Sequence, residues 1–214
     1  MRTKLLAGSW LVVCLFIMSG NASAQVDEHP SEVGGLLTSI TLTDFQSRLF
    51  PTQNFRGSSQ VTGVGGRYSY NFNKYLALDT EANFFPSNHF LNEEFGQKMQ
   101  AFAGVRAGIR IKKVGVFAKA RPGVMWFGDF SSRGSCSVTS FGSICGVAHE
   151  KDFAMDVGGV IEYYPTNRFI VRVDAGDTII RYQEHVFATV ATPVIVPAET
   201  KNNFQISIGV GWRF

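Results

Sequence analysis

The 214-residue sequence predicts an all-β fold: an eight-stranded antiparallel up-and-down β-barrel that spans a membrane. Three observations lead to this prediction. Eight segments alternate apolar and polar residues with a period of two, which is typical of strands with two different faces. Long and short connections between these segments follow one another in strict alternation. The polar faces combine small residues with balanced charges, as expected of a narrow barrel lumen.

A leader precedes the first of these segments. Arg2 and Lys4 form a positively charged start, residues 11–18 are apolar, and Ala22-Ser23-Ala24 is a small-residue cleavage site. The apolar run is shorter than the ~20 residues that a membrane-spanning helix needs. These features predict a secretory signal peptide that is cleaved after Ala24.

The predicted organisation is therefore a signal peptide at 1–24, a short periplasmic segment at 25–30 and one barrel at 31–214. Removing Arg2 and Lys4 with the leader leaves 18 bases against 17 acids. A net charge this close to zero argues against a nucleic-acid partner, which would need a basic surface. No motif suggests a bound cofactor or metal ion.

The eight segments differ in how clearly they alternate. They cover residues 31–43, 59–72, 75–85, 97–111, 114–127, 152–164, 169–181 and 203–214. In the fifth, Val114, Val116 and Ala118 alternate with Gly115 and Lys119. The last is the clearest, with one apolar face formed by Phe204, Ile206, Ile208, Val210, Trp212 and Phe214.

The connections indicate how the strands are placed. Three are tight: around 73–74, around 112–113, and at 165–168. Four are long and polar: 44–58, 86–96, 128–151 and 182–202. An up-and-down meander places the short turns at one end and the long loops at the other. This is the pattern of bacterial outer-membrane barrels, which have short periplasmic turns and longer extracellular loops.

The residue types on the two faces indicate which face meets lipid. The polar face carries seven bases and five acids, which fit a lumen where each ion finds a partner: Arg67, Asp79, Glu81, Arg106, Arg110, Lys119, Arg121, Asp156, Glu162, Arg172, Asp174 and Arg213. The apolar face carries no charge at the strand centres, where Lys or Arg would cost about 2–4 kcal/mol in lipid. The alternative is a soluble ligand barrel with its apolar face inside.

Aromatic residues gather at the strand ends, as in the interface belts of membrane proteins. They are Tyr68, Tyr70, Phe72, Tyr75, Phe84, Phe85, Trp126, Phe127, Tyr163, Phe169, Trp212 and Phe214. In a soluble barrel the same residues would plug the ends. Together with the leader and the unequal connections, they favour the membrane barrel.

Two cysteines remain outside the leader, Cys136 and Cys145, in a stretch rich in Ser and Gly. An exported chain with two cysteines favours one disulfide. Closing this small loop would stabilise the fold by about 2–3 kcal/mol on the chain-entropy model. A metal-binding role is disfavoured, because no nearby Cys or His pair has ligand spacing.

Several motifs carry a resemblance to a known family. The final strand, 204–214, ends in an aromatic residue after alternate apolar ones, residues 65–72 followed by 75–78 form a strand-turn-strand pattern, and 32–37 fits more loosely. Across 31–214 the chain resembles the small eight-stranded outer-membrane barrels of the OmpA/OmpX type. The resemblance implies that the barrel assembly machinery reads the final strand. Full-length OmpA proteins add a peptidoglycan-binding domain, and this sequence stops at the barrel, so no such tether is expected.

The function expected first is a structural or surface-interaction role, with four extracellular loops displayed by a filled barrel. Expected partners are outer-membrane lipid and lipopolysaccharide, the assembly machinery, and an extracellular partner that contacts the loops. Seven loop phenylalanines could make such contacts or pack on one another: Phe45, Phe50, Phe55, Phe90, Phe95, Phe130 and Phe141. The alternative is a narrow pore or solute conduit, gated when lumenal ion pairs exchange partners.

An outer-membrane lipid-modifying enzyme or protease is the third class. Its candidate residues are His89, His149 and His185, each in or beside a long connection, while His29 precedes the first strand. None has a Ser or a pair of Asp residues in a catalytic arrangement. We therefore expect no enzymatic activity.

Overall fold

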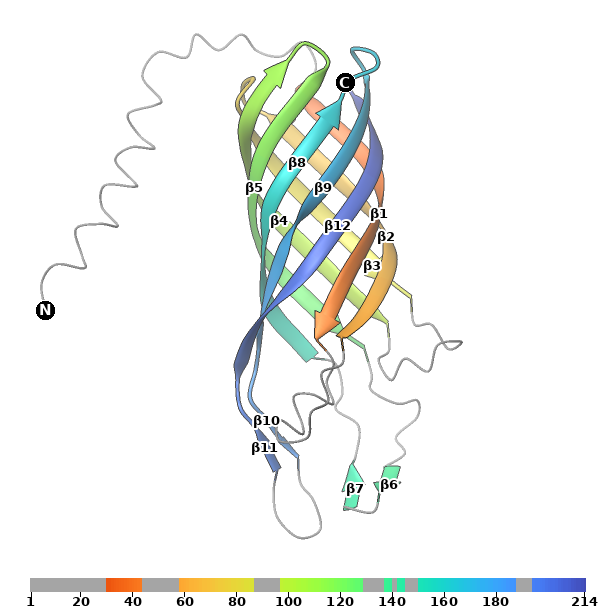
Figure 1. Cartoon of the computed structure of the whole chain (residues 1–214), viewed down its shortest axis with the longest axis vertical. Helices are drawn as coiled ribbons and strands as arrows, with labels where there is room; N and C mark the ends of the chain where they lie inside the picture. The colour runs from red at the N-terminus through yellow and green to blue at the C-terminus, as the bar shows by residue number, and fades with distance from the viewer. Residues whose placement is uncertain are drawn as a thin grey trace, which may run out of the picture.

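Eight long strands close into one antiparallel barrel, so the predicted fold class is confirmed (Figure 1). The computed structural model describes residues 30–43, 58–86, 97–128, 137–139, 142–144, 150–187 and 194–214. The strands follow one another around the barrel in the order β1-β12-β9-β8-β5-β4-β3-β2. Their bounds are β1 (Ser31–Thr43), β2 (Ser58–Asn71), β3 (Leu76–Phe85), β4 (Lys98–Ile111), β5 (Val114–Phe127), β8 (Glu150–Tyr163), β9 (Phe169–Tyr182) and β12 (Glu199–Arg213).

Four further strands form two small hairpins outside the barrel wall. They are β6 (Ser137–Thr139) with β7 (Gly142–Ile144), and β10 (His185–Phe187) with β11 (Val194–Val196). Both hairpins lie in connections predicted to be long loops. They sit beyond the end of the barrel opposite the C-terminus, where the long connections lie (Figure 1). We assign this end to the cell exterior, because long loops of outer-membrane barrels face outward.

The last strand begins four residues earlier than predicted, at Glu199 instead of 203. Its ladder with β9 continues to the pair Glu199↔Tyr182. Residues 199–202 are all polar and do not alternate with apolar residues, which is why the sequence predicts a loop there. Pairing with β9 satisfies its backbone groups and holds it in the sheet.

Closure of the barrel depends on the ladder between β1 and β12, which runs from Glu32↔Arg213 to Ile40↔Gln205. This ladder joins the first strand to the last and removes both sheet edges. Hydrocarbon offers no partner for unpaired backbone N–H and C=O groups, so a strand structure can span a bilayer only when it is closed in this way. Among the described residues, no helix is long and apolar enough to cross a membrane.

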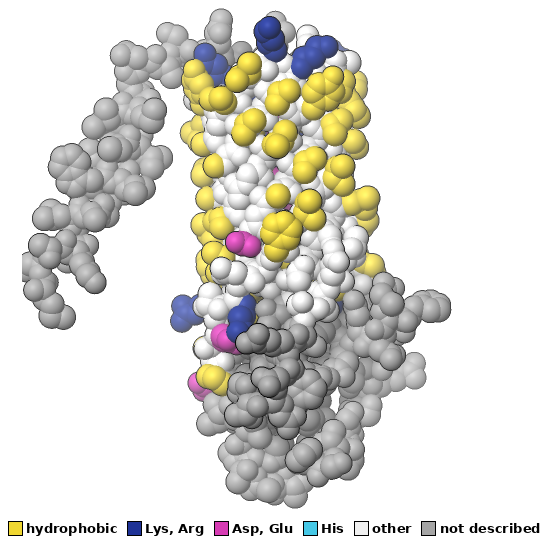
Figure 2. Space-filling model, in the orientation of Figure 1, with side chains coloured by type: hydrophobic (Ala, Val, Ile, Leu, Met, Phe, Trp, Pro, Cys, Tyr) yellow, Lys and Arg dark blue, Asp and Glu magenta, His cyan; other side chains and the backbone are white. Residues whose placement is uncertain are grey.

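The two faces of the wall have opposite character. Large apolar side chains are exposed on the outward face and form a hydrophobic band (Figure 2). On β12 this face consists of the predicted residues, which are all between 44% and 58% exposed. In β5, Ala118 is exposed and Lys119 next to it is 4% exposed. A water-soluble protein would bury the first kind of residue and expose the second, so the inverted pattern identifies a lipid-facing surface.

Two predictions about the outward face are wrong. Phe85 is fully buried in the lumen and Phe127 packs partly buried beside it, so neither belongs to an interface belt. Asp177 lies half-buried on the outward face of β9, between Val157 and Phe204 on the neighbouring strands. The apolar face therefore does carry one acid, in the extracellular half of β9.

An apolar layer fills the extracellular half of the lumen. Inward-facing residues of seven strands form it, and none is more than 3% exposed: Ile40, Leu42, Val61, Phe85, Phe102, Met125, Ala154, Ile180 and Tyr182. The Phe127 and Tyr182 rings pack with centroids 6.0 Å apart at its edge. This layer lies in the extracellular half of the lumen, where buried Lys98 and Asp152 pair with Phe85 and Met125 on neighbouring strands.

The predicted disulfide lies outside the described residues. Its two cysteines, Cys136 and Cys145, come directly before and after the β6–β7 hairpin in the sequence. The outermost described pair of that hairpin is Ser137↔Ile144, and the cysteines are the next residues along the chain on each side. The disulfide stays a prediction.

Charge placed on the two faces of β5 should have unequal consequences. Replacing Ala118 by Arg should lower the free energy of unfolding in lipid bilayers by about 2–4 kcal/mol, because the guanidinium would face hydrocarbon. Replacing Lys119 by Gln should lower it less, because both carboxylates near Lys119 keep an arginine partner. Denaturant titration of each variant, refolded in vesicles, measures the difference. A larger loss at Lys119 than at Ala118 would mean that the faces are inverted.

Candidate functional site

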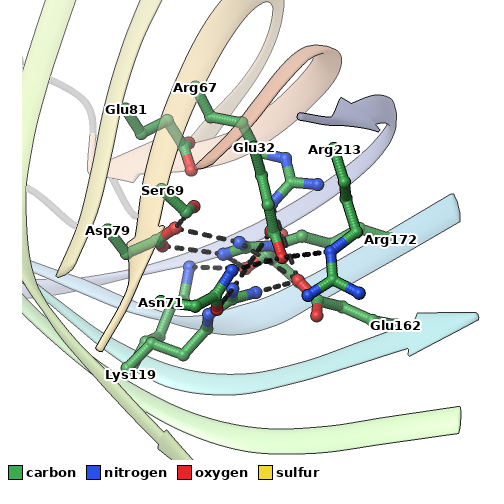
Figure 3. A network of polar contacts seen from close by, with 12 residues as sticks. Glu32, Arg67, Ser69, Asn71, Asp79, Glu81, Lys119, Glu162, Arg172 and Arg213 are labelled. Atoms are coloured by element: carbon green, nitrogen blue, oxygen red, sulfur yellow. Dashed lines mark hydrogen bonds and ion pairs between the residues drawn. The ribbon is translucent and has the colours of Figure 1, made fainter. Parts of the chain in front are cut away.

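The most unusual site among the described residues is the charged part of the lumen (Figure 3). All twelve ionisable residues predicted for the lumen lie on the inward face of the wall. Eleven of them are buried, and the side chain of Arg110 is 12% exposed at the periplasmic mouth. Burying this many ions is costly unless each one is paired, so the pairing pattern decides what the site can do.

Glu32, which was not among the predicted residues, is one centre of this network. Its carboxylate is fully buried and lies 3.1 Å from Arg106 and 3.3 Å from each of Arg110 and Arg213. The Asn71 amide also donates a hydrogen bond to it at 2.8 Å. One carboxylate thus gathers cations from β4 and β12 at the periplasmic end of the lumen.

Glu32 was missed because β1 alternates poorly. Its inward face also carries Leu36, Ile40 and Leu42, while Ser39 and Thr41 lie on the outward face. The reason is the apolar layer, which places large hydrophobic residues inside the barrel at the extracellular end of this strand. The prediction also missed two buried ionisable residues near the starts of strands, Lys98 and Asp152. Both lie an even number of positions before the inward-facing residues that follow them in the same strand.

Asp79 is the second centre of the network. The Arg172 guanidinium donates to both of its oxygens, at 3.0 and 2.8 Å, and Arg121 donates to one of them at 2.8 Å. Ser69 donates a further hydrogen bond. Two-pronged pairing of a guanidinium with a carboxylate is the strongest form of such contacts.

Other carboxylates distribute the remaining charge. Arg172 also pairs with Asp174 at 2.7 Å, and Arg121 pairs with Glu81 at 2.7 Å and with Asp156. Lys119 lies 2.9 Å from Asp156 and 3.5 Å from Asp174. With Glu32, Lys98 and Asp152 added to the predicted twelve, the lumen holds eight bases and seven acids, so its charge is almost balanced.

Several of these contacts cross the full width of the barrel. Asp79 is on β3 and Arg172 on β9, which are four strands apart in either direction around the eight-stranded wall. Gln100 on β4 and Gln205 on β12 are likewise opposite, and they share a hydrogen bond of 3.1 Å. Side chains that bond across a diameter occupy the barrel axis. The lumen is therefore filled at these two levels.

Arg67 is the exception within the network. It is buried, and none of its three guanidinium nitrogens makes a hydrogen bond to the described residues. Its nearest carboxylates are Glu162 at 3.6 Å and Glu32 at 3.8 Å. Gly34 and Gly211 make room for it, since a Cβ on either residue would lie 3.0 Å from the guanidinium. Arg67 is thus held between two acids without being fixed to either.

Aromatic rings and arginines close the periplasmic mouth. The Phe117 ring lies under both Arg106 and Arg110, at 4.7 and 5.2 Å, and the Tyr164 ring lies under Arg213 at 5.4 Å. The Tyr164 hydroxyl accepts a hydrogen bond from Arg110 at 2.8 Å and donates one to Glu162. These stacked groups keep the guanidinium groups in place where the lumen meets the periplasm.

The lumen offers no catalytic or metal-binding arrangement among the described residues. No group of three or more His, Cys, Asp or Glu residues in the described ranges could hold a metal ion. Of the candidate catalytic histidines, His89 and His149 lie outside the described residues, and His185 is described only as part of β10. The carboxylates of six lumenal residues each lie within reach of a cation: Glu32, Asp79, Glu81, Asp156, Glu162 and Asp174. The arrangement can neutralise charge, fill space and couple opposite walls.

Removing the Glu32 carboxylate should destabilise the barrel strongly. In Glu32→Gln, three arginines lose their shared anion inside the lumen, which should cost about 3–5 kcal/mol of unfolding free energy. The matched control is Glu199→Gln, because Glu199 forms an exposed ion pair with Lys201 and should cost no more than about 1 kcal/mol. Denaturant titration in detergent or vesicles measures both. Equal losses in the two variants would show that the Glu32 cluster contributes no more than a surface pair.

Comparison with solved structures finds the same fold in two proteins. The attachment invasion locus protein Ail of Yersinia pestis is 13% identical, with a TM-score of 0.54 over 87% of this chain and 99% of Ail. Neisserial surface protein A has a TM-score of 0.55 at 13% identity, over 86% of this chain and 97% of that one. Similarity at this identity concerns the fold.

Comparison with curated proteins returns no match. The profile of the family described as "Outer membrane protein beta-barrel domain" matches residues 10–214, which include all of the strands. A closed eight-stranded wall, an apolar exterior and a neutralised lumen agree with that family. The chain therefore belongs to the outer membrane protein β-barrel domain family and is an outer-membrane β-barrel.

Proposed function

We propose that this protein is a structural or surface-interaction protein, whose filled barrel displays four extracellular loops. The observation that carries the proposal is the direct bonding of side chains across the barrel diameter, by Arg172 to Asp79 and by Gln100 to Gln205. The Gln100–Gln205 contact lies at the level of the apolar layer, because Gln100 pairs with Met125 and Gln205 pairs with Ile40. The stacked arginines cover the periplasmic side. A barrel filled at three levels serves as a scaffold for its loops.

The composition of the loops indicates the chemistry of the partner. Segments 44–57, 87–96, 129–149 and 183–198 contain three bases and five acids together with eight phenylalanines. Ail has been solved in complex with the heparin analogue sucrose octasulfate. A weakly acidic, Phe-rich set of loops is a poor match for such a polyanion. We infer that these loops engage an apolar or protein surface, and not a sulfated polysaccharide.

Several features of the sequence would bring the chain to the outer membrane and hold it there. We propose that residues 1–24 are a signal peptide removed after Ala24, and that 25–30 stay in the periplasm before the barrel. The assembly machinery would read the final strand, whose apolar residues all face outward up to Phe214, 58% exposed. A Cys136–Cys145 disulfide would stabilise the loop that carries the β6–β7 hairpin. Lipopolysaccharide would surround the extracellular end.

A narrow conduit is the second candidate function, and Arg67 favours it. A guanidinium that lies between two carboxylates without a hydrogen bond to either can change partners at little cost. Such an exchange would move charge along the lumen and act as a gate. Nothing in the described part of the lumen favours catalysis, and we propose that the protein is not an enzyme.

Electrical recordings separate the two candidates. The purified protein, inserted into planar bilayers, should give no discrete openings at any applied voltage, because the lumen is filled at three levels. A sixteen-stranded porin in the same bilayer is the positive control for insertion and detection. Arg67→Gln should also stay silent. Discrete openings of the unmodified protein that change in Arg67→Gln would replace the structural role by the gated conduit.

A further inference from the structure

The three tight turns at the periplasmic end carry a concentration of positive charge. Lys74, Lys112, Lys113 and Arg168 are all exposed, and the turns 72–75, 112–113 and 165–168 contain no acid. We call these four residues the basic collar. Figure 2 shows Lys and Arg side chains above the hydrophobic band at this end of the barrel. The loop and lumen functions discussed above make no use of them.

The basic collar is not neutralised by the described part of the protein. None of its four side chains lies within 4.0 Å of a carboxylate of the described residues. The buried lumenal bases show the opposite behaviour, since nearly all lie against one to three acids, and exposed Lys201 pairs with Glu199. The collar charge is therefore available to an anion from outside the chain.

The backbone of one collar residue is strained. Ile111 pairs with Val114, so Lys112 and Lys113 form a two-residue hairpin turn. Lys112 has a φ of 53°, and it is the only non-glycine residue with a positive φ among the described ones. Glycine or asparagine adopts this conformation at lower cost, and hairpin turns usually place them here. A lysine at a position that favours glycine points to a role for its charge.

The collar lies at the depth of lipid headgroups. The Lys74 ammonium is 4.9 Å from the centroid of the Tyr75 ring, and Tyr75 is 49% exposed on the outward side. Tyr163 and Trp212, 47% and 49% exposed, belong to the same aromatic belt. Such belts mark the boundary between hydrocarbon and headgroups. Bases immediately beyond the belt reach the phosphates of the surrounding leaflet.

We propose that the basic collar binds the anionic headgroups of phospholipids in the periplasmic leaflet and so anchors the barrel at this depth. The occupant is a lipid, because the collar residues lie next to the belt on turns that join three different strand pairs around the end of the barrel. Each base near an anionic surface adds a favourable, salt-dependent attraction. The inference is independent of the role proposed for the loops, which lie at the other end of the barrel.

Two tryptophans allow the two ends of the barrel to be tested separately. Trp212 lies at the collar end and Trp126 at the extracellular end of β5. The chain from residue 25 onward, which keeps Asp27 and Glu28 and lacks Trp10, is refolded into phosphatidylcholine vesicles with a minority of phosphatidylglycerol. One lipid at a time is brominated, so that fluorescence quenching reports the lipid next to the remaining tryptophan. Trp126→Phe isolates Trp212, and Trp212→Phe isolates Trp126.

At Trp212, phosphatidylglycerol should be enriched about threefold over its share of the vesicle, and concentrated salt should abolish the enrichment. At Trp126 the ratio should be about one. Replacing all four collar residues by Gln should bring the ratio at Trp212 to about one, while the variant keeps its heat-modifiable migration on gels. Equal ratios at both tryptophans, or an enrichment that survives the four substitutions or the salt, would overturn the proposal.

Discussion

Hydrocarbon excludes charge and unpaired backbone groups, and this constraint accounts for most of the structure. The wall closes through the β1–β12 ladder because an open edge has no hydrogen-bond partner in lipid. Most ionisable side chains of the wall point inward because the outward side offers them no solvation. Once inside a barrel of eight strands they are too crowded for bulk water, so they must pair with one another. Glu32 and Asp79, each facing two or more arginines, are the anions on which this pairing depends.

Pairing across the lumen gives the barrel a second set of connections besides its backbone ladder. The ladder joins neighbouring strands, whereas the contact between Asp79 and Arg172 joins opposite walls. The apolar layer at the extracellular end adds packing without charge, centred on Phe85 and Met125. These contacts inside the lumen make the wall rigid without help from the loops. The loop sequences are then free to serve recognition. The basic collar is likewise independent of the loops, since it concerns only the periplasmic end.

How much the sequence predicts depends on whether one face of a strand stays uniform. From Phe204 onward the outward residues of β12 are all apolar and the inward ones polar or small, so the facing of this part follows from period two alone. In β1 the rule fails, because Leu36 and Ile40 fill the lumen beside Glu32. Phe85 was misplaced for the same reason, since an aromatic residue at a strand end suits either a belt or a plug. The pairing of Asp79 with Arg172 lies beyond any sequence pattern, because it depends on which strands face each other across the closed barrel.

The central claim is that charges on opposite walls stabilise the barrel by direct pairing. A double-mutant cycle of Asp79→Asn and Arg172→Gln tests it most directly, with unfolding free energies measured in the same vesicles for the four proteins. Asp79 and Arg172 lie on opposite strands, so coupling carried by the backbone ladder is small. The account predicts a coupling energy of about 1.5 kcal/mol or more between the two substitutions. Losses that add to within about 0.5 kcal/mol would contradict it, because each side chain would then stabilise the barrel independently of the other.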